Sequence, residues 1–544
     1  MPLFLALATC VGIGVGMKLK KEALLESAPK NVMPTAPAAE EIVGRGRIEE
    51  ILRYVDAKYV DEVNDVALID HTVNNLLHEL DPHSVYLPIE DLKRLNEDLA
   101  GEYEGIGIDA ISLNDTLTIV ASIANSAAAE SGLMTGDKVL TINDSNAIGK
   151  NLRWFNQQLR GKKGTTLKLT ILRESDESLH NLTLTRDRVT INSVDIATVL
   201  DDKTGYVKIS RFANTTSREF MQALEKLYEK KSVRDLIIDL RQNPGGYLDK
   251  ANDILSQIFP DKDKLLVYTK GRTVHRNEYK TTGRSRHDIG KVAILIDEGS
   301  ASTSEIVAGA IQDWDRGIIV GRRSFGKGMV QEPYRLSDGS ELRLTVARFF
   351  TPTGRSIQKN YKNISRKQYD AEETRRYELG ELTNENAYFQ ADTTRFFTAS
   401  GRVVFGGGGI KPDLFVPIQP WLKNDYFIQL RQWIPEYAYR YFLEFRRDIK
   451  HKDWQEFQRQ FRVSEYAFSE FLKYTERQGI KRDMRQIALV KEPLRRLLKA
   501  RIARMIYGEE GYYGILSEND PVIMRAFDAL KQNDPLGLQQ TARK

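Results

Sequence analysis

The pattern of apolar and polar positions divides this chain of 544 residues into regions of different character. In the region 43–100, apolar residues recur at helical spacing over 48–55 and again over 66–80, which predicts a helical hairpin. The sequence Asp-Pro-His-Ser at 81–84 then forms a turn, because proline and the short polar residues favour one. The first region is therefore expected to be an N-terminal helical region.

The region 189–420 alternates short apolar runs with amphipathic stretches, and this alternation indicates an α/β layer structure. A polar and charged segment, 358–400, interrupts the pattern and is expected to be an insertion. The strands are predicted at 205–210, 236–240, 292–296, 317–320 and 340–350, and the helices at 216–230 and 248–259.

The region 421–544 has aromatic and aliphatic residues at helical spacing, which predicts a helical C-terminal extension. It carries 24 Lys and Arg against 17 Asp and Glu, which is a net charge of +7, whereas the net charge of the whole chain is +5. This excess of positive charge could serve anionic lipid, a partner or self-association, or it could be the solvated face of a helical bundle. The small total charge argues against a nucleic-acid partner.

The stretch 291–331 holds the candidate chemistry. The run 292–296 is apolar and β-branched, as in a strand buried on both faces, and a Ser/Thr cluster after it leads into a helix. A serine in such a turn has its hydroxyl at the carboxyl edge of the sheet, close to helix-start N–H groups that stabilise an oxyanion. Ser302 is therefore a candidate nucleophile.

A serine needs a base, and none of the seven histidines stands in a recognisable motif. Lys327 follows a second apolar run, at 317–321, and has a glycine on each side. A tight turn can therefore place its amine in a cleft. Burial lowers the pKa of an amine, which is what a lysine base requires. His83 is expected to be structural, and Glu305 is expected to be an acid that interacts with the helix dipole.

These residues resemble a known family. Ser-Ala-Ser-Thr-Ser-Glu at 300–305 and Phe-Gly-Lys-Gly-Met-Val-Gln at 325–331 are similar to the active site of the carboxyl-terminal processing, or tail-specific, proteases. The resemblance implies that Ser302 is the nucleophile, Lys327 the general base and Gln331 the residue that orients the lysine. It also implies a crotonase-like fold, in which the Thr303 N–H and that of Gly245 or Gly246 form the oxyanion hole.

The region 101–188 resembles the PDZ domain of the same family. Its carboxylate-binding loop corresponds to Gly105, Ile106, Gly107 and Ile108, whose N–H groups would form a nest for a terminal carboxylate. Arg160 could reach toward the protease, or it could be a solvated loop arginine.

The N-terminal end is apolar over 2–17 and then basic, which predicts an export signal or membrane anchor over 1–21, followed by a Pro/Ala-rich linker over 22–42. The sequence Leu-Ala-Thr-Cys at 7–10 faintly resembles a lipoprotein cleavage box, with the single cysteine of the chain at its end. We therefore expect an exported protein in the bacterial periplasm, with the N-terminal segment either an export signal or an anchor in the inner membrane.

The sequence as a whole predicts a serine endopeptidase with a Ser–Lys dyad that recognises protein or peptide substrates by their free C-termini. No cofactor or metal is implied, and a homo-oligomer is possible. The alternative is a non-catalytic PDZ-containing binding or scaffold protein on the same fold.

Overall fold

The computed structural model describes residues 45–173, 176–229, 232–387 and 392–536, so the expected export segment and linker lie outside the described residues. The chain divides into two compact units, Met1–Val73 and Asn74–Lys544. The first unit contains α2 (Arg45–Lys58) and most of α3 (Asp65–His78), which cover the two predicted helical stretches. Within the described ranges, no helix is both long enough and apolar enough to cross a membrane.

The core of the second unit is a six-stranded sheet. Its order is β10-β11-β12-β15-β16-β21, in which β10 runs antiparallel to β11 and the other neighbours are parallel. Parallel neighbours joined by helices are the α/β structure that the sequence predicts. The strands are β10 (Val194–Val199), β11 (Thr204–Ile209), β12 (Asp235–Asp239), β15 (Val292–Ile296), β16 (Ile318–Gly321) and β21 (Leu414–Phe415).

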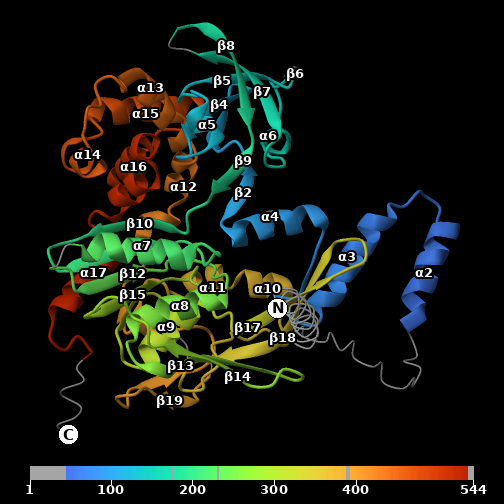
Figure 1. Ribbon diagram of the computed structural model, residues 1–544, viewed down its shortest axis with the longest axis vertical. Coiled ribbons are helices and arrows are strands. Elements are labelled where there is room, and N and C mark those ends of the chain that lie inside the picture. The colour runs from blue at the N-terminus through green and yellow to red at the C-terminus, as the bar shows by residue number, and fades with distance from the viewer. Residues whose placement is uncertain (1–44, 174–175, 230–231, 388–391, 537–544) are drawn as a thin grey trace, which may run out of the picture. The chain divides into compact units, whose positions relative to one another are not determined.

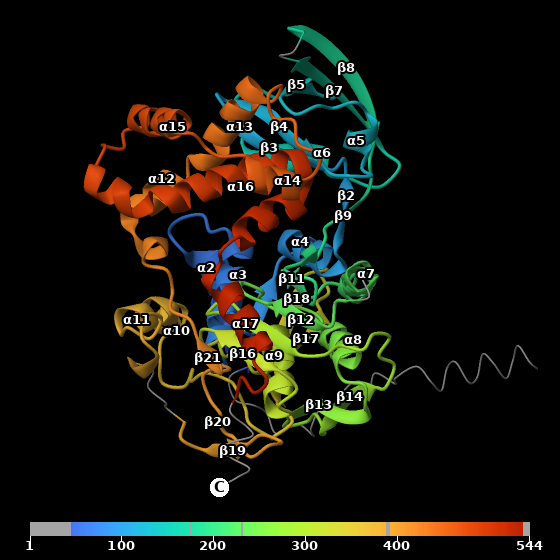
Figure 2. The ribbon, with the colours of Figure 1, turned by 90° about the vertical axis from the view of Figure 1, so that its left-hand side faces the viewer.

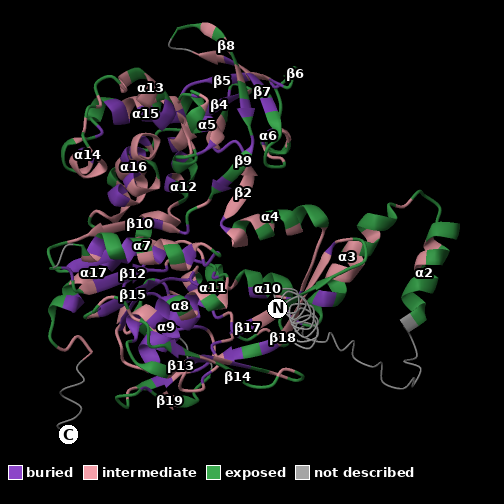
Figure 3. Cartoon of the chain, viewed as in Figure 1, coloured by how far each residue is buried: buried purple, intermediate pink, exposed green. Residues whose placement is uncertain are grey.

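The two faces of this sheet are covered by helices from different parts of the chain. On one face, Ile238 and Ile294 pack with α7 (Thr216–Tyr228), α8 (Leu248–Ile258) and α9 (Thr303–Asp313). Figure 3 shows that buried residues concentrate in these strands and in α9. Because every residue of α9 is buried, its polar side chains need partners inside the protein.

The other face is covered by α17 (Pro521–Lys531), the last helix among the described residues, as Figures 1 and 2 show. Val522, Ile523 and Ala526 pack against a cluster that includes Leu295 and Val320. The sequence predicts a helical extension over 421–544, but not that one of its helices packs on the protease sheet.

A second sheet lies beside the region of Lys327. Strand β18 is its centre: it pairs with β17 over Met329–Arg335, with β1 and with β13, and β13 pairs in turn with β14. The sequence pattern predicts β18 alone of these. The strands are β1 (Val85–Leu87), β13 (Lys262–Gly271), β14 (Asn277–Thr282), β17 (Met329–Arg335) and β18 (Glu341–Phe350).

The expected insertion is folded. The helices α10 (Arg366–Asp370) and α11 (Glu372–Glu378) place Tyr369 and Arg376 in buried positions, where Arg376 pairs with Glu381. The remaining short elements are η1 (Glu385–Ala387), β19 (Arg395–Phe397) and β20 (Val403–Phe405).

The residues that resemble a PDZ domain form a small β-structure with its own apolar core. After α4 (Ile89–Ala100), strand β2 pairs with β9, and the main sheet has the order β3-β4-β5-β7-β8, with β3 at its edge. The elements are β2 (Glu102–Gly105), β3 (Ile108–Leu113), β4 (Thr116–Ser122), α5 (Ala127–Glu130), β5 (Lys138–Ile142), β6 (Ser145–Asn146), α6 (Leu152–Leu159), β7 (Thr166–Arg173), β8 (Ser178–Thr185) and β9 (Asp187–Thr190).

The C-terminal extension is helical, as the sequence predicts, with a separate apolar core. Its longest helix, α16, bends at Gly508, which has φ 65° and ψ −152°. The elements are η2 (Pro420–Lys423), α12 (Asp425–Arg431), α13 (Ile434–Phe445), α14 (Trp454–Gln460), α15 (Glu465–Arg477) and α16 (Met484–Ser517).

The packing of α17 predicts a contrast between two neighbouring residues. We expect Ile523→Ala to lower the free energy of unfolding by about 2–4 kcal/mol, because Ile523 is 2 % exposed and its removal leaves a cavity. Met524, which is 43 % exposed on the same helix, is the control, and Met524→Ala should change stability by less than ~0.5 kcal/mol. Denaturant titration of the full chain measures both, and equal effects would contradict this placement of α17.

Candidate active site

The proposed nucleophile lies at a strained point between β15 and α9. Ser302 is the N-cap of α9 and has φ 54° and ψ −113°, a conformation that a residue with a side chain rarely adopts. Strain of this kind persists only where the surroundings hold the backbone in place. The main-chain N–H of Ser302 donates to Glu305 Oε2 at 2.8 Å, which is one such restraint.

The turn at Ser302 is fastened to the turn that follows β12. Ser304 Oγ donates to the Asn243 carbonyl at 2.9 Å, and Thr303 Oγ1 donates to the Gly246 carbonyl at 2.8 Å. The main chain adds a third bond, from Ala301 N–H to the same Asn243 carbonyl at 3.0 Å. The Ser/Thr cluster therefore joins two turns that are distant in sequence, in addition to starting a helix.

Gly245 lies directly against the proposed nucleophile. A Cβ at this position would come within 2.9 Å of Ser302 Cβ and 3.0 Å of the Thr303 nitrogen, and φ is 101°, so only glycine fits. Its own N–H donates to Asn243 Oδ1 at 2.9 Å. Of the two glycines, Gly246 is therefore the better candidate to act with the Thr303 N–H on an oxyanion.

Glu305 is the centre of the site rather than only a helix-dipole acid. Its side chain is fully buried, and Oε2 accepts from the main-chain N–H groups of both Ser302 and Lys327, each at 2.8 Å. Oε1 accepts from the Gly326 N–H at 2.7 Å and from Ser324 Oγ at 2.5 Å. Burial raises the pKa of Glu305 to about 7, although these four donors oppose the rise.

Lys327 is brought to Ser302 by that carboxylate. Glu305 Oε2 accepts from the main-chain N–H groups of both Ser302 and Lys327. The distance between these two nitrogens therefore cannot exceed the sum of the two hydrogen-bond lengths, each 2.8 Å. Burial is the main reason that the pKa of Lys327 is lowered, and the charge of Arg343 lowers it further. Glu305 and Asp81 act in the opposite direction. The net lowering of the pKa increases the fraction of neutral amine, which is the form that a base needs.

Gln331, the residue expected to orient Lys327, lies on β17. Its Nε2 donates to Thr345 Oγ1 on β18 at 3.3 Å. This bond restrains the side-chain amide on one side. A bond between Gln331 and Lys327 is absent from the interactions of the described residues, so the orienting role remains a prediction.

His83 lies near Lys327 but is bonded elsewhere. Its Nε2 is 2.8 Å from the Tyr369 hydroxyl, and the two rings meet edge to face. Burial, and then the charge of Lys327, lower the pKa of His83 to about 3, so the ring is neutral at pH 7. Tyr369 also packs against Lys359, whose Nζ lies 4.0 Å from the ring centroid. The folded insertion thus contributes to the surroundings of the site.

The proposed carboxylate-binding loop joins β2 to β3. The Ile106 carbonyl accepts from the Ala128 N–H at 2.8 Å, and the Gly107 carbonyl accepts from Ile123 N–H at 2.9 Å and Ser126 Oγ at 3.1 Å. Both carbonyls are therefore turned into the domain. The neighbouring strand β3, which begins at Ile108, pairs with β4 on one side only among the described strands, so its other edge has no strand partner there. Asp109 of β3 forms an ion pair with Arg504 of α16 at 2.9 Å.

Arg160 is partly exposed, and its guanidinium has partners next to the PDZ-like domain. It forms an ion pair with Glu97 of α4, and its guanidinium lies 4.6 Å from the centroid of the Tyr103 ring. This pairing attaches the end of α6 to the helix that precedes the PDZ-like domain.

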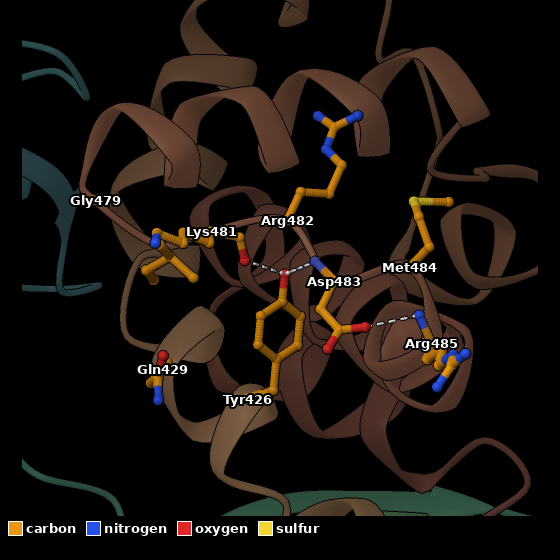
Figure 4. Close-up of a pocket in the computed structure, with 9 residues that line it drawn as sticks. Tyr426, Gln429, Gly479, Lys481, Arg482, Asp483, Met484 and Arg485 are labelled. Carbon is orange, nitrogen blue, oxygen red and sulfur yellow. Dashed lines mark hydrogen bonds between the residues drawn. The ribbon is translucent and has the colours of Figure 1, made fainter.

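A separate pocket lies among the C-terminal helices (Figure 4). Tyr426 spans it, since its hydroxyl donates to the Lys481 carbonyl at 3.2 Å and accepts from the Asp483 N–H at 3.3 Å. None of the proposed catalytic residues lines this pocket. Among the described residues, no group of three or more His, Cys, Asp or Glu side chains could hold a metal ion.

The four hydrogen bonds to Glu305 predict a large loss of stability and activity when one oxygen of its carboxylate is replaced by an NH₂ group. We expect Glu305→Gln to lower the free energy of unfolding by about 1–3 kcal/mol and to abolish activity, because the new NH₂ would face groups that are themselves donors. Glu225→Gln, at a half-exposed position of α7, is the matched control and should be silent. Thermal unfolding and peptide cleavage test this, and wild-type behaviour of Glu305→Gln would contradict it.

Three regions of the chain match known protein families. Residues 203–365 match the model of peptidase family S41, residues 105–184 match a PDZ domain, and residues 426–508 match a family of unknown function. A solved structure of a photosystem II D1 C-terminal processing protease shares 27 % identity, covers 57 % of this chain and 89 % of its own, and superimposes with a TM-score of 0.33.

Two curated relatives match more than half of this chain. The carboxy-terminal-processing protease of Bartonella bacilliformis is 34 % identical over 318 residues, which are 57 % of this chain and 72 % of the relative. The carboxy-terminal processing protease CtpB of Bacillus subtilis is 33 % identical over 316 residues, which are 58 % of this chain and 65 % of the relative. This chain therefore belongs to the carboxy-terminal-processing proteases of peptidase family S41.

Proposed function

We propose that this protein is a serine endopeptidase in which Ser302 is the nucleophile and Lys327 the general base. The observation that carries the proposal is the shared carboxylate oxygen of Glu305, which bonds the main-chain N–H groups of both residues. The lowered pKa of Lys327 supports it, because a lysine can accept a proton only when its amine is neutral.

The reaction proceeds through an acyl-enzyme. Lys327 Nζ takes the proton of the Ser302 hydroxyl as Oγ attacks the scissile carbonyl, and the N–H groups of Thr303 and Gly246 stabilise the oxyanion. Lys327 then gives the proton to the leaving amine. A water molecule, deprotonated by the same amine, releases the acyl group and restores the Ser302 hydroxyl.

The PDZ domain would supply the choice of substrate. The loop 105–108 is proposed to hold a free α-carboxylate, while the last residues of the substrate pair with the open edge of β3. We further propose that the protein acts outside the cytoplasm, on the basis of the apolar and basic pattern of its first 21 residues. The alternative, a binding protein without catalysis, is distinguished from this proposal by the first experiment below.

Loss of either member of the dyad should abolish cleavage. We expect Ser302→Ala and Lys327→Ala to reduce cleavage of an unfolded protein to background with unchanged folding, because nucleophile and base act as a unit. Lys327→Arg should be equally inactive, since arginine stays protonated. His275→Ala serves as the control and should cleave normally. Cleavage by Ser302→Ala at the wild-type rate would refute the proposal, and an inactive wild type would favour the binding protein.

The pH dependence should report the amine. Because burial lowers the pKa of Lys327 below 10.5, kcat/KM should rise with pH as the neutral amine forms, and the midpoint should lie below that value. Glu305 also titrates near neutrality, so the profile is measured at two temperatures. The pKa of an amine falls on warming, whereas that of a carboxyl group hardly changes. A temperature-independent midpoint, or a flat profile, would exclude Lys327 as the base.

Removing the terminal charge of the substrate should weaken its recruitment. We expect an amidated peptide to bind at least about 1.5 kcal/mol more weakly than the free acid, because a charged acceptor is lost and nothing else changes. Binding and cleavage by the full chain are compared, with Ser302→Ala used for the binding measurement. Equal binding and cleavage of the two peptides would overturn the role of the loop and leave the dyad untouched.

A further inference from the structure

A line of hydrogen bonds behind Gln331 ends on a buried carboxylate. Gln331 Nε2 donates to Thr345 Oγ1 at 3.3 Å, and Thr345 Oγ1 donates to Asp81 Oδ1 at 3.0 Å. Asp81 is only 7 % exposed. The line therefore connects β17, through β18, to the turn that precedes β1.

The carboxylate of Asp81 is surrounded by donors. Oδ1 also accepts from the N–H groups of His83 at 2.7 Å and Ser84 at 2.8 Å, and Oδ2 accepts from Ser84 Oγ at 2.6 Å. Ser84 Oγ accepts in turn from the Thr345 N–H at 3.1 Å. Asp81 thus holds Thr345 both directly and through Ser84, and an ionised carboxylate is the group that suits so many donors.

The direction of these bonds fixes the orientation of the Gln331 amide. A carboxylate can only accept, so the single proton of the Thr345 hydroxyl is given to Asp81. The hydroxyl oxygen must then accept from Gln331, and only Nε2 can donate to it. The carbonyl oxygen Oε1 of Gln331 is consequently directed away from Thr345.

The carboxylate at the end of this line interacts electrostatically with the proposed base. Asp81 is one of the groups whose charge acts on Lys327, and the charge of Lys327 acts on the neighbouring His83. An amide in the opposite orientation would present its N–H groups toward this region. Such a group can donate to the lone pair of a neutral amine, which would remove the base from the reaction.

We infer that Asp81 is a positioning residue for Lys327: through Thr345 it fixes the Gln331 amide so that Oε1 accepts from Nζ and the lone pair of Nζ is left for the Ser302 hydroxyl. This inference rests on the proposed function. It assigns Thr345 a role that depends on its hydroxyl, whereas a role in packing would depend on its methyl group.

The experiment compares three residues at Thr345 in two backgrounds. With an unfolded protein as substrate, Thr345→Val should lower kcat roughly three- to tenfold, the effect of one hydrogen bond, and leave KM within about twofold. Thr345→Ser, which keeps the hydroxyl, should restore kcat. In a Gln331→Ala background, where the line is already broken, Thr345→Val should cost less than about a further twofold. Thr282→Val, exposed on β14, is the control.

Several results would overturn the inference. These are wild-type kcat for Thr345→Val or for Gln331→Ala, an equal loss for Thr345→Ser, or an undiminished loss in the Gln331→Ala background. Thermal unfolding shows whether Thr345→Val folds. If it does not, Asp81→Asn is compared in its place, in the wild-type and Gln331→Ala backgrounds. Ser302→Ala is assayed in parallel: if it cleaves, the proposed function fails, whereas if it is inactive and Thr345→Val is fully active, only the positioning role fails.

Discussion

The site depends on one buried carboxylate. Glu305 accepts four hydrogen bonds, and two of them come from the main-chain N–H groups of Ser302 and Lys327. Buried backbone N–H groups need an acceptor, so one carboxylate that accepts from two loops holds both loops in place. The strained conformation of Ser302 is held in the same way.

The supports of the two proposed catalytic residues come from different sheets. Ser302 is fastened to the parallel core sheet, through Asn243 and Gly246 of the turn after β12. Lys327 precedes β17 of the second sheet, and Gln331 and Thr345 connect that strand to the turn at Asp81. Glu305 accepts hydrogen bonds from both Ser302 and Lys327, so it connects the two supports directly at the proposed catalytic residues.

Much of this arrangement could be predicted because its signals are local. The apolar run 292–296, the turn at Ser302 and the following helix are adjacent in sequence, and the structure has them as β15 and α9. The Lys327 loop follows β16 for the same reason. By contrast, three of the four partners of Glu305 lie nineteen or more residues after it, at Ser324, Gly326 and Lys327, and the helix dipole explains an acid at that position without them.

Other features had no local signal. Thr345 is 264 residues from Asp81, and neither residue has a neighbour in sequence that indicates the other. The apolar residues of β13 are consecutive rather than alternating, and β14 has one aromatic residue among polar ones, so neither shows the alternation of a half-buried strand. The first 44 residues lie outside the described residues, so the export segment stays a prediction.

The position of α17 determines when the core sheet can complete its folding during synthesis. The sheet face that includes Ile237, Leu295 and Val320 is covered by a helix made about one hundred residues after the last strand, β21. At the usual rate of synthesis, roughly 5–20 residues per second, that face is bare for several seconds while the nascent chain grows. Folding of the core is therefore expected to finish only after α17 has been synthesised. A chain that ends early would be an aggregation-prone fragment and not a shorter protease.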